Sequence, residues 1–145
     1  MSDNEELLRR SILELRILEG NAGELQARLN VLNVFSNELQ VANATIDGLT
    51  EEKDGVQVYI PVGGGSYIQA VVDEPRKVLV GVGAGVAIEK ETAEAIKSLQ
   101  EQQSQLESAR QALQQQLTQV VQKMSEIRTE INGISRKMSQ GTRSV

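Results

Sequence analysis

Apolar residues recur with heptad spacing in two long segments of the chain. In the C-terminal segment one seam position, called d, is held by Leu99, Leu106, Leu113, Val120, Ile127 and Ile134. The interleaved position, called a, is held by Ile96, Gln103, Arg110, Leu117, Met124, Ile131 and Met138. The N-terminal segment has Ser11, Leu18, Leu25, Leu32, Leu39 and Ile46 at d, with Leu8, Leu15, Ala22, Leu29, Ser36 and Asn43 at a. Such a repeat is typical of coiled-coil helices.

The polar interruptions of the two repeats coincide when the chain is folded back on itself. Ser36 then falls opposite Arg110, and Asn43 falls opposite Gln103. The apolar layers in the same register include Leu25 with Val120, Leu32 with Leu113 and Ile46 with Leu99. Polar seam residues cost stability unless they find polar partners, so matched interruptions predict an antiparallel pair of helices within one chain.

Between the two repeats the period of the pattern changes from seven to two. Alternating residues predict strands over 56–62, 66–73, 77–82 and 85–89, with glycine-rich turns at 63–65 and 83–84. Four short strands cannot bury both of their faces. We therefore expect this segment to need partner subunits, which would contact its apolar residues Val56, Val58, Ile60, Ile68, Val72, Val78, Val80, Val82, Val86 and Ile88.

These elements give a mainly α fold with a small β region, in which two β-hairpins join the helices of a long antiparallel coiled-coil hairpin. Ser2 and Glu5 have the spacing of a capping box at the start of the first helix, and we expect Gly48 to end that helix. The predicted organisation is a helix over 1–48, hairpins over 49–90, a helix over 91–140 and a disordered tail over 141–145.

Composition removes several classes of function. The chain has no Cys and no His, which excludes thiolate chemistry, disulfides and the commonest general base. Its net charge of -5 disfavours nucleic-acid binding. It has no apolar run long enough to span a membrane, and an acidic start where a secretory signal would be basic. We predict a soluble, cytoplasmic protein.

Three local motifs resemble a dinucleotide-binding loop, a phosphate-binding loop and an acidic catalytic or metal-binding cluster, but none has the full pattern that its chemistry requires. The glycines of residues 81–85 lack the third small residue of a dinucleotide fingerprint, because Val86 stands there, and no helix follows directly. The run Gly63–Gly65 has no Lys-Ser/Thr after it, as a P-loop requires. Glu51, Glu52 and Asp54 have the pattern of a solvated connector. We therefore predict no enzyme activity, no cofactor and no metal site.

Apolar residues off the seam gather near the chain ends. Leu13 and Ile17 fall at outward positions, while Leu7 and Ile12 flank the seam and could be ordinary packing. A cluster of this kind is a candidate binding surface, although fraying of the helix ends is the alternative. The candidate surface for substrate comprises Leu7, Leu8, Ile12, Leu13, Ile17, Ile131, Ile134 and Met138.

The middle segment resembles the alpha class of the prefoldin family. The resemblance rests on residues 60–67, Ala70, residues 77–86 and the pair Glu89-Lys90, and it extends over essentially the whole chain. It implies a hexamer of two alpha-class and four beta-class subunits, whose hairpins form a platform of β-barrels. It also implies that the coiled-coil tips hold unfolded polypeptides and pass them to a group II chaperonin without nucleotide.

A second class of function is compatible with the same pattern. A structural or tethering coiled-coil protein would use its tips to bind one defined partner. Such a protein would show saturable binding to that partner and little protection of unrelated unfolded chains.

Overall fold

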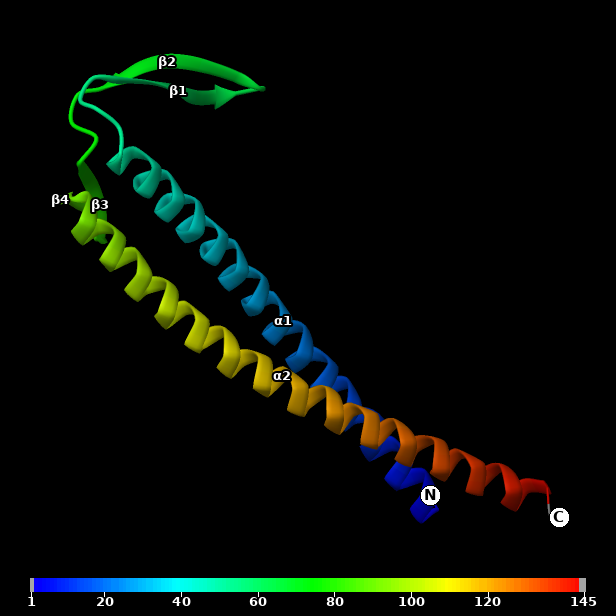
Figure 1. Cartoon of the computed structure of the whole chain (residues 1–145). Helices are drawn as coiled ribbons and strands as arrows, with labels where there is room; N and C mark the ends of the chain where they lie inside the picture. Colours follow the sequence, from blue (N-terminus) through cyan, green and yellow to red (C-terminus); the bar gives the residue numbers. More distant parts are fainter. Residues whose placement is uncertain (1, 144–145) are drawn as a thin grey trace. The chain divides into compact units, whose positions relative to one another are not determined.

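The structure is a computed structural model of the chain and describes residues 2–143. In chain order its elements are α1 (Asp3–Thr50), β1 (Val56–Gly63), β2 (Ser66–Val72), β3 (Lys77–Gly83), β4 (Val86–Glu91) and α2 (Thr92–Arg143) (Figure 1). Two long helices with two β-hairpins between them confirm the predicted fold class.

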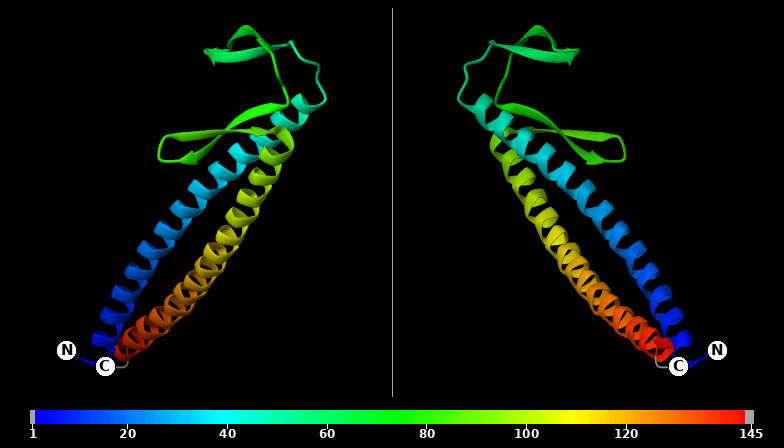
Figure 2. Two further views of the ribbon diagram at one scale, coloured as in Figure 1. Left: turned by 90° about the vertical axis from the view of Figure 1, so that its left-hand side faces the viewer. Right: turned by 90° about the vertical axis from the view of Figure 1, so that its right-hand side faces the viewer.

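The chain divides into two compact units, and both helices contribute to each. The arm unit comprises Met1–Asn33 and Ser108–Val145, and the hairpin unit comprises Val34–Glu107. Within the arm unit the α1 and α2 segments run antiparallel and side by side, as the views in Figure 2 show. The start of α1 and the end of α2 therefore belong to the same unit.

The seam between the helices follows the predicted heptads. Every a and d position of α1 from Leu8 to Ile46 is buried or half-buried, and so is every one of α2 from Ile96 to Met138. Almost all other positions of α1 are exposed. The most buried apolar residues of the arm unit are all seam residues: Leu29, Met124, Ile127 and Ile134. The heptad prediction is confirmed, and the core of the arm unit is a thin seam.

The start of α1 is capped as expected, but its end lies beyond the predicted stop. Ser2 Oγ accepts a hydrogen bond from the backbone N–H of Glu5 at 3.2 Å, which satisfies one of the free donors of the first turn. The helix continues through Gly48 to Thr50, whose hydroxyl donates to the carbonyl of Ile46 at 2.8 Å. The helix ends at Thr50, and the connector that follows reaches its first left-handed backbone at Gly55, with φ of 76°.

Helix α2 begins directly after β4 and extends further than expected. The backbone N–H of Thr92 donates to the carbonyl of Arg76 at 2.8 Å, which ties the helix start to the turn before β3. Residues 141–143 are helical, where the sequence predicted a disordered tail; residues 144 and 145 lie outside the described residues. Extending a helix that has already formed fixes only one residue for each added hydrogen bond, so a terminal glycine need not end it.

The four strands form two separate antiparallel hairpins, β1 with β2 and β3 with β4. The first turn uses Gly63, Gly64 and Gly65, all with positive φ, as the glycine run indicates. The second turn adds Ala84 at φ 53°, a conformation that costs a residue with a Cβ about 1 kcal/mol. Gly85 belongs to this turn, so β4 begins at Val86 rather than at the predicted residue 85.

Candidate interaction surfaces

The first hairpin carries a continuous apolar face. Residues directly opposite in an antiparallel pair share a face, as do alternate residues along a strand. By this rule the face consists of the pairs Val56 with Val72, Val58 with Ala70 and Ile60 with Ile68. The opposite face is mixed, since Gln69 donates a hydrogen bond to Gln57 at 3.0 Å beside the exposed Tyr59.

The second hairpin has a shorter apolar face. Val80 lies opposite Ile88 on the same face as Val78, whose partner is Lys90. Val82 falls within the register shift near the turn, and both it and Val86 are exposed. The other face pairs Lys77 with Glu91 and Leu79 with Glu89.

These two apolar faces, called here the hairpin faces, are open to solvent in the isolated chain. Ile60 is 49% exposed, Ile68 57% and Ile88 47%, while Val56, Val58, Val72, Val78 and Val80 are half-buried. An isolated two-stranded hairpin is marginally stable in water and gains stability when its apolar face is covered. The faces are therefore candidate assembly surfaces.

The apolar residues near the start of α1 form a second exposed surface. Leu7, Ile12, Leu13 and Ile17 are exposed, the last of them at 61%, and Leu8 is half-buried. A groove of about 320 Å³ is lined by Leu8, Ile12, Leu13, Glu5, Arg9 and Arg16. We call Leu7, Leu8, Ile12, Leu13 and Ile17 the arm-end surface.

The α2 residues predicted to extend this surface are less accessible. Ile131 and Met138 are half-buried, and Ile134 is only 6% exposed. Ile134 occupies a d position, so its side chain packs in the seam and offers little area to another molecule. In this structure the exposed part of the candidate surface lies on α1.

The sequence pattern did not predict one apolar groove of the structure. It lies in the arm unit, has a volume of about 650 Å³, and is lined by Glu24, Ala27, Arg28, Val31, Leu32, Ala109, Ala112 and Leu113. Val31 is 54% exposed at an outward heptad position. Small apolar residues at outward positions of both helices could have indicated this groove. The heptad pattern predicts only which residues lie in the seam, so the groove was not expected.

The polar layer of the seam is joined by a hydrogen bond between the helices. Gln103 Nε2 donates to Ser36 Oγ at 2.7 Å. The predicted register sets Gln103 opposite Asn43, whereas this hydrogen bond and the cavity that Gln103 shares with Asn43 place Gln103 between Ser36 and Asn43. Asn43, the predicted neighbour of Gln103, lines the same cavity as Gln103. Leu32 and Leu113, which the predicted register pairs, line the same groove.

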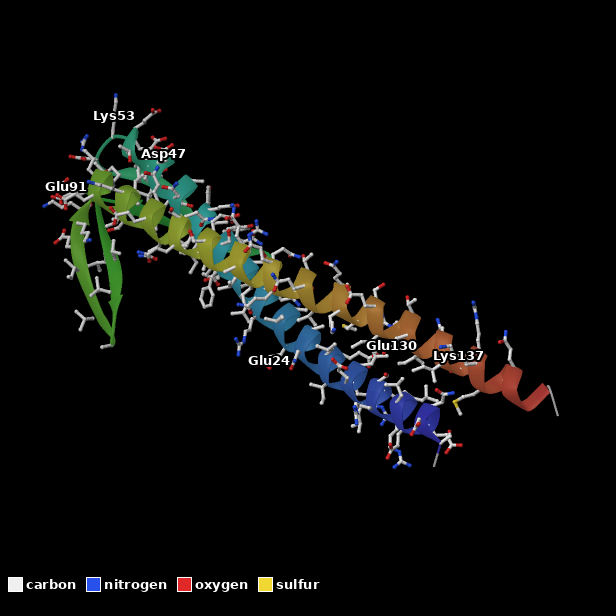
Figure 3. All side chains as sticks on the ribbon, turned by 90° about the horizontal axis from the view of Figure 1, so that it is seen from below. Glu24, Asp47, Lys53, Glu91, Glu130 and Lys137 are labelled. Atoms are coloured by element: carbon white, nitrogen blue, oxygen red, sulfur yellow. The ribbon has the colours of Figure 1, made fainter. Side chains whose placement is uncertain are left out.

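Charged groups lie on the surface and contribute little to stability. Glu24 on α1 and Lys137 on α2 stand on the surface of the arm unit (Figure 3). Arg128 pairs with Glu19 across the helices at 3.6 Å, and exposed pairs of this kind contribute about 0–1 kcal/mol. The carboxylate of Glu74 accepts a hydrogen bond from Lys77 and, with the charge of Glu89, raises the pKa of Lys77 above its ordinary 10.5.

Two other kinds of site, a metal-binding cluster and a membrane-spanning helix, are absent from residues 2–143. These residues hold no group of three or more acidic, His or Cys side chains placed to bind a metal ion. Neither α1 nor α2 is apolar enough over its described length to cross a membrane.

Comparison with known proteins identifies the family. The family model described as "Prefoldin subunit" matches residues 18–137. The prefoldin subunit alpha of Methanopyrus kandleri is 33% identical over 103 residues, which cover 71% of this chain and 66% of that protein. The prefoldin subunit alpha of Archaeoglobus fulgidus is 30% identical, with 74% of this chain and 84% of that protein covered.

A solved structure agrees with the sequence relatives. The cryo-EM structure of filamentous PFD from Methanocaldococcus jannaschii matches with a TM-score of 0.54 and 26% identity. The match covers 86% of this chain and 98% of that chain. Two long antiparallel helices joined by two hairpins define the class, a coiled-coil subunit with a small β region. The chain belongs to the prefoldin family, and its curated relatives named above are alpha subunits.

Proposed function

We propose that this chain is the alpha-class subunit of a cytoplasmic chaperone that holds non-native polypeptides without nucleotide and delivers them to a group II chaperonin. Family membership supports the chaperone class. The observation that carries the finer proposal is the presence of two kinds of exposed apolar surface in one chain, the hairpin faces and the arm-end surface.

The hairpin faces suit assembly with other subunits. Each presents a row of apolar side chains from paired strands, and each strand pair has free edges that can accept further strands. Covering both would build a larger sheet around a shared core. The expected partners are beta-class subunits, in an assembly of two alpha and four beta chains.

The arm-end surface suits weak and unspecific holding. At roughly 25 cal/mol per Å² of apolar area, a few leucine and isoleucine side chains give modest affinity once the cost of ordering the client is subtracted. Several arms acting on one unfolded chain raise the effective concentration without requiring any client sequence. Release then needs only competition from another apolar surface, such as that of a chaperonin.

The test combines assembly with client protection. The chain is mixed with a beta-class subunit, the mass of the product is measured by light scattering, and the product is assayed for suppression of aggregation of a thermally unfolded client. We expect a mass for two alpha and four beta chains, and protection that Leu13→Ser/Ile17→Ser greatly reduces. Val121→Ser is the matched control, since it removes an exposed valine of the arm unit outside the arm-end surface.

Two results would contradict the proposal. If the assembly with Leu13→Ser/Ile17→Ser still protects the client fully, the arm-end surface is not the client-binding site. Failure of the chain to assemble with folded beta-class partners would remove the multivalency on which holding depends.

A tethering role is the second candidate, and the groove lined by Ala27, Val31 and Ala112 favours it. A defined groove of about 650 Å³ between two helices suits one partner segment of complementary shape. Saturable one-to-one binding, blocked by Ala112→Gln and combined with no protection of unrelated clients, would favour tethering over holding.

A further inference from the structure

Two buried carbonyl oxygens in the hairpin unit lack a hydrogen-bond donor. They are Asn43 Oδ1 and Gln103 Oε1, from the polar layer of the seam. Buried acceptors of this kind are rare, because each has given up its bonds to bulk water and has nothing in return. Their pairing in one layer calls for a donor that both can share.

Both oxygens belong to residues that line one small cavity. Its volume is about 120 Å³, and its lining consists of Leu39, Gln40, Asn43, Leu99, Gln100 and Gln103. A cavity needs roughly 10–15 Å³ of such space to hold one water molecule. The volume of this cavity and the two carbonyl oxygens at its lining residues together suit a small neutral molecule that donates hydrogen bonds.

The chemistry of the lining favours water over a cation. All six lining residues are uncharged, so a desolvated cation would have no counter-charge. A water molecule has two O–H donors, which matches the two orphaned acceptors, and it can accept from the side-chain amides.

We propose that Asn43 and Gln103 bind an ordered water that bridges α1 and α2, and that this hydrated layer holds the two helices in one register. Gln103 is the link to the rest of the layer, since its Nε2 already donates to Ser36 Oγ at 2.7 Å. A slip of one heptad in the predicted register would break this layer, since it sets Asn43 opposite Ile96 in one direction and Ser36 opposite Leu117 in the other. The proposal does not depend on the client-holding function.

A double-mutant cycle on the full chain in its assembly tests the shared site. Asn43→Leu alone should lower the unfolding midpoint by about 5 °C, because Gln103 Oε1 stays buried and loses its bridge. Gln103→Leu alone should do the same. The double variant should recover the wild-type midpoint or exceed it, since two leucines fill the layer without an unpaired acceptor. Gln122→Leu, an exposed change of the same type, should leave the midpoint unchanged.

Register and hydration supply independent readouts. The double variant should lose register specificity, which disulfide trapping detects: cysteines introduced at Leu32 and Leu113 should form the cross-link less completely than in the wild-type background. A high-resolution crystal structure of the assembly should show water within hydrogen-bond distance of both oxygens. A direct amide–amide bond in that density, or single-variant losses that simply add in the double variant, would overturn the proposal.

Discussion

The seam of the arm unit and the seam of the hairpin unit are built differently. In the arm unit Leu29, Met124, Ile127 and Ile134 are nearly fully buried. In the hairpin unit the layers around Ser36, Asn43 and Gln103 are half-buried and polar. Two helices with one heptad register thus have two kinds of contact.

The difference shows that stability and specificity are distributed separately along the helices. Apolar layers stabilise a helix pair but tolerate slippage, because one leucine packs against another nearly as well. Polar layers contribute little stability and fix the pairing, since they are satisfied in one register only. The arm unit depends mainly on the first kind of contact, with Ser11 as a buried polar residue in its seam. The hairpin unit combines both kinds, since half-buried Leu39 and Leu99 lie beside its polar seam residues.

The largest expected effect comes from emptying an apolar layer. Ile127→Ala removes a side chain that is 2% exposed and should lower the free energy of unfolding by about 2–5 kcal/mol. Chemical denaturation of the assembled protein measures this. Val121→Ala, an exposed neighbour on α2, should change it by less than about 0.5 kcal/mol, and equal losses for the two variants would contradict a seam-based core.

The next effect concerns the hairpin faces. Ile60→Ser/Ile68→Ser should weaken assembly with beta-class subunits at least about tenfold, because burial of a large apolar side chain contributes roughly 1.5–3 kcal/mol. Titration followed by native mass spectrometry measures the loss. Tyr59→Ser changes the opposite face of the same hairpin and should be milder. The reverse order would assign assembly to the other face.

A smaller effect of opposite sign is expected at two glycines of the arm unit. Gly20 and Gly23 lie inside α1, and a Cβ at either would meet no atom within 4 Å. Gly20→Ala/Gly23→Ala should therefore raise the stability of the arm by about 1 kcal/mol for each change. If glycine flexibility lets the arms adapt, the range of client sizes protected should narrow. An unchanged range would leave these glycines without a role in holding.

The smallest effect is a pH dependence at the turn before β3. Because its folded-state pKa is raised, the contribution of Lys77 is fully present below its ordinary 10.5 and is lost as the pH rises through the folded value. The thermal unfolding midpoint should be measured below pH 10.5 and again above the raised pKa of Lys77. Between the two pH values it should fall slightly more in the wild type than in Glu74→Gln. Identical slopes would mean that the pair of Lys77 with Glu74 is not formed in solution.

The parts of the structure that repeat along the chain could be predicted from the sequence. Seam residues from Leu8 to Met138 were predicted because a seven-residue spacing fixes the buried side of a helix. The hairpins could be predicted because alternation and glycine turns are equally local signals. Family resemblance added the class of protein, which the periodicity alone cannot give.

Features that depend on side-chain length or three-dimensional packing could not be predicted. The contact of Gln103 with Ser36 requires a rotamer that spacing does not reveal. Ile134 was named both as a seam residue and as part of the candidate surface, and its 6% exposure agrees with the seam. The groove beside Ala112 arises only when two outward faces meet. The end of α1 was misplaced because Gly48 adopts the helical backbone that its neighbours impose.

The most direct test of the division between the two units is one aggregation assay on matched assemblies. Leu13→Ser/Ile17→Ser and wild-type chains are each assembled with the same beta-class subunit, adjusted to equal concentration and equal measured mass, and given the same unfolded client. The account predicts intact assembly with strongly reduced protection for the variant. Equal protection by the two assemblies would contradict it, since holding would then reside outside the arm-end surface.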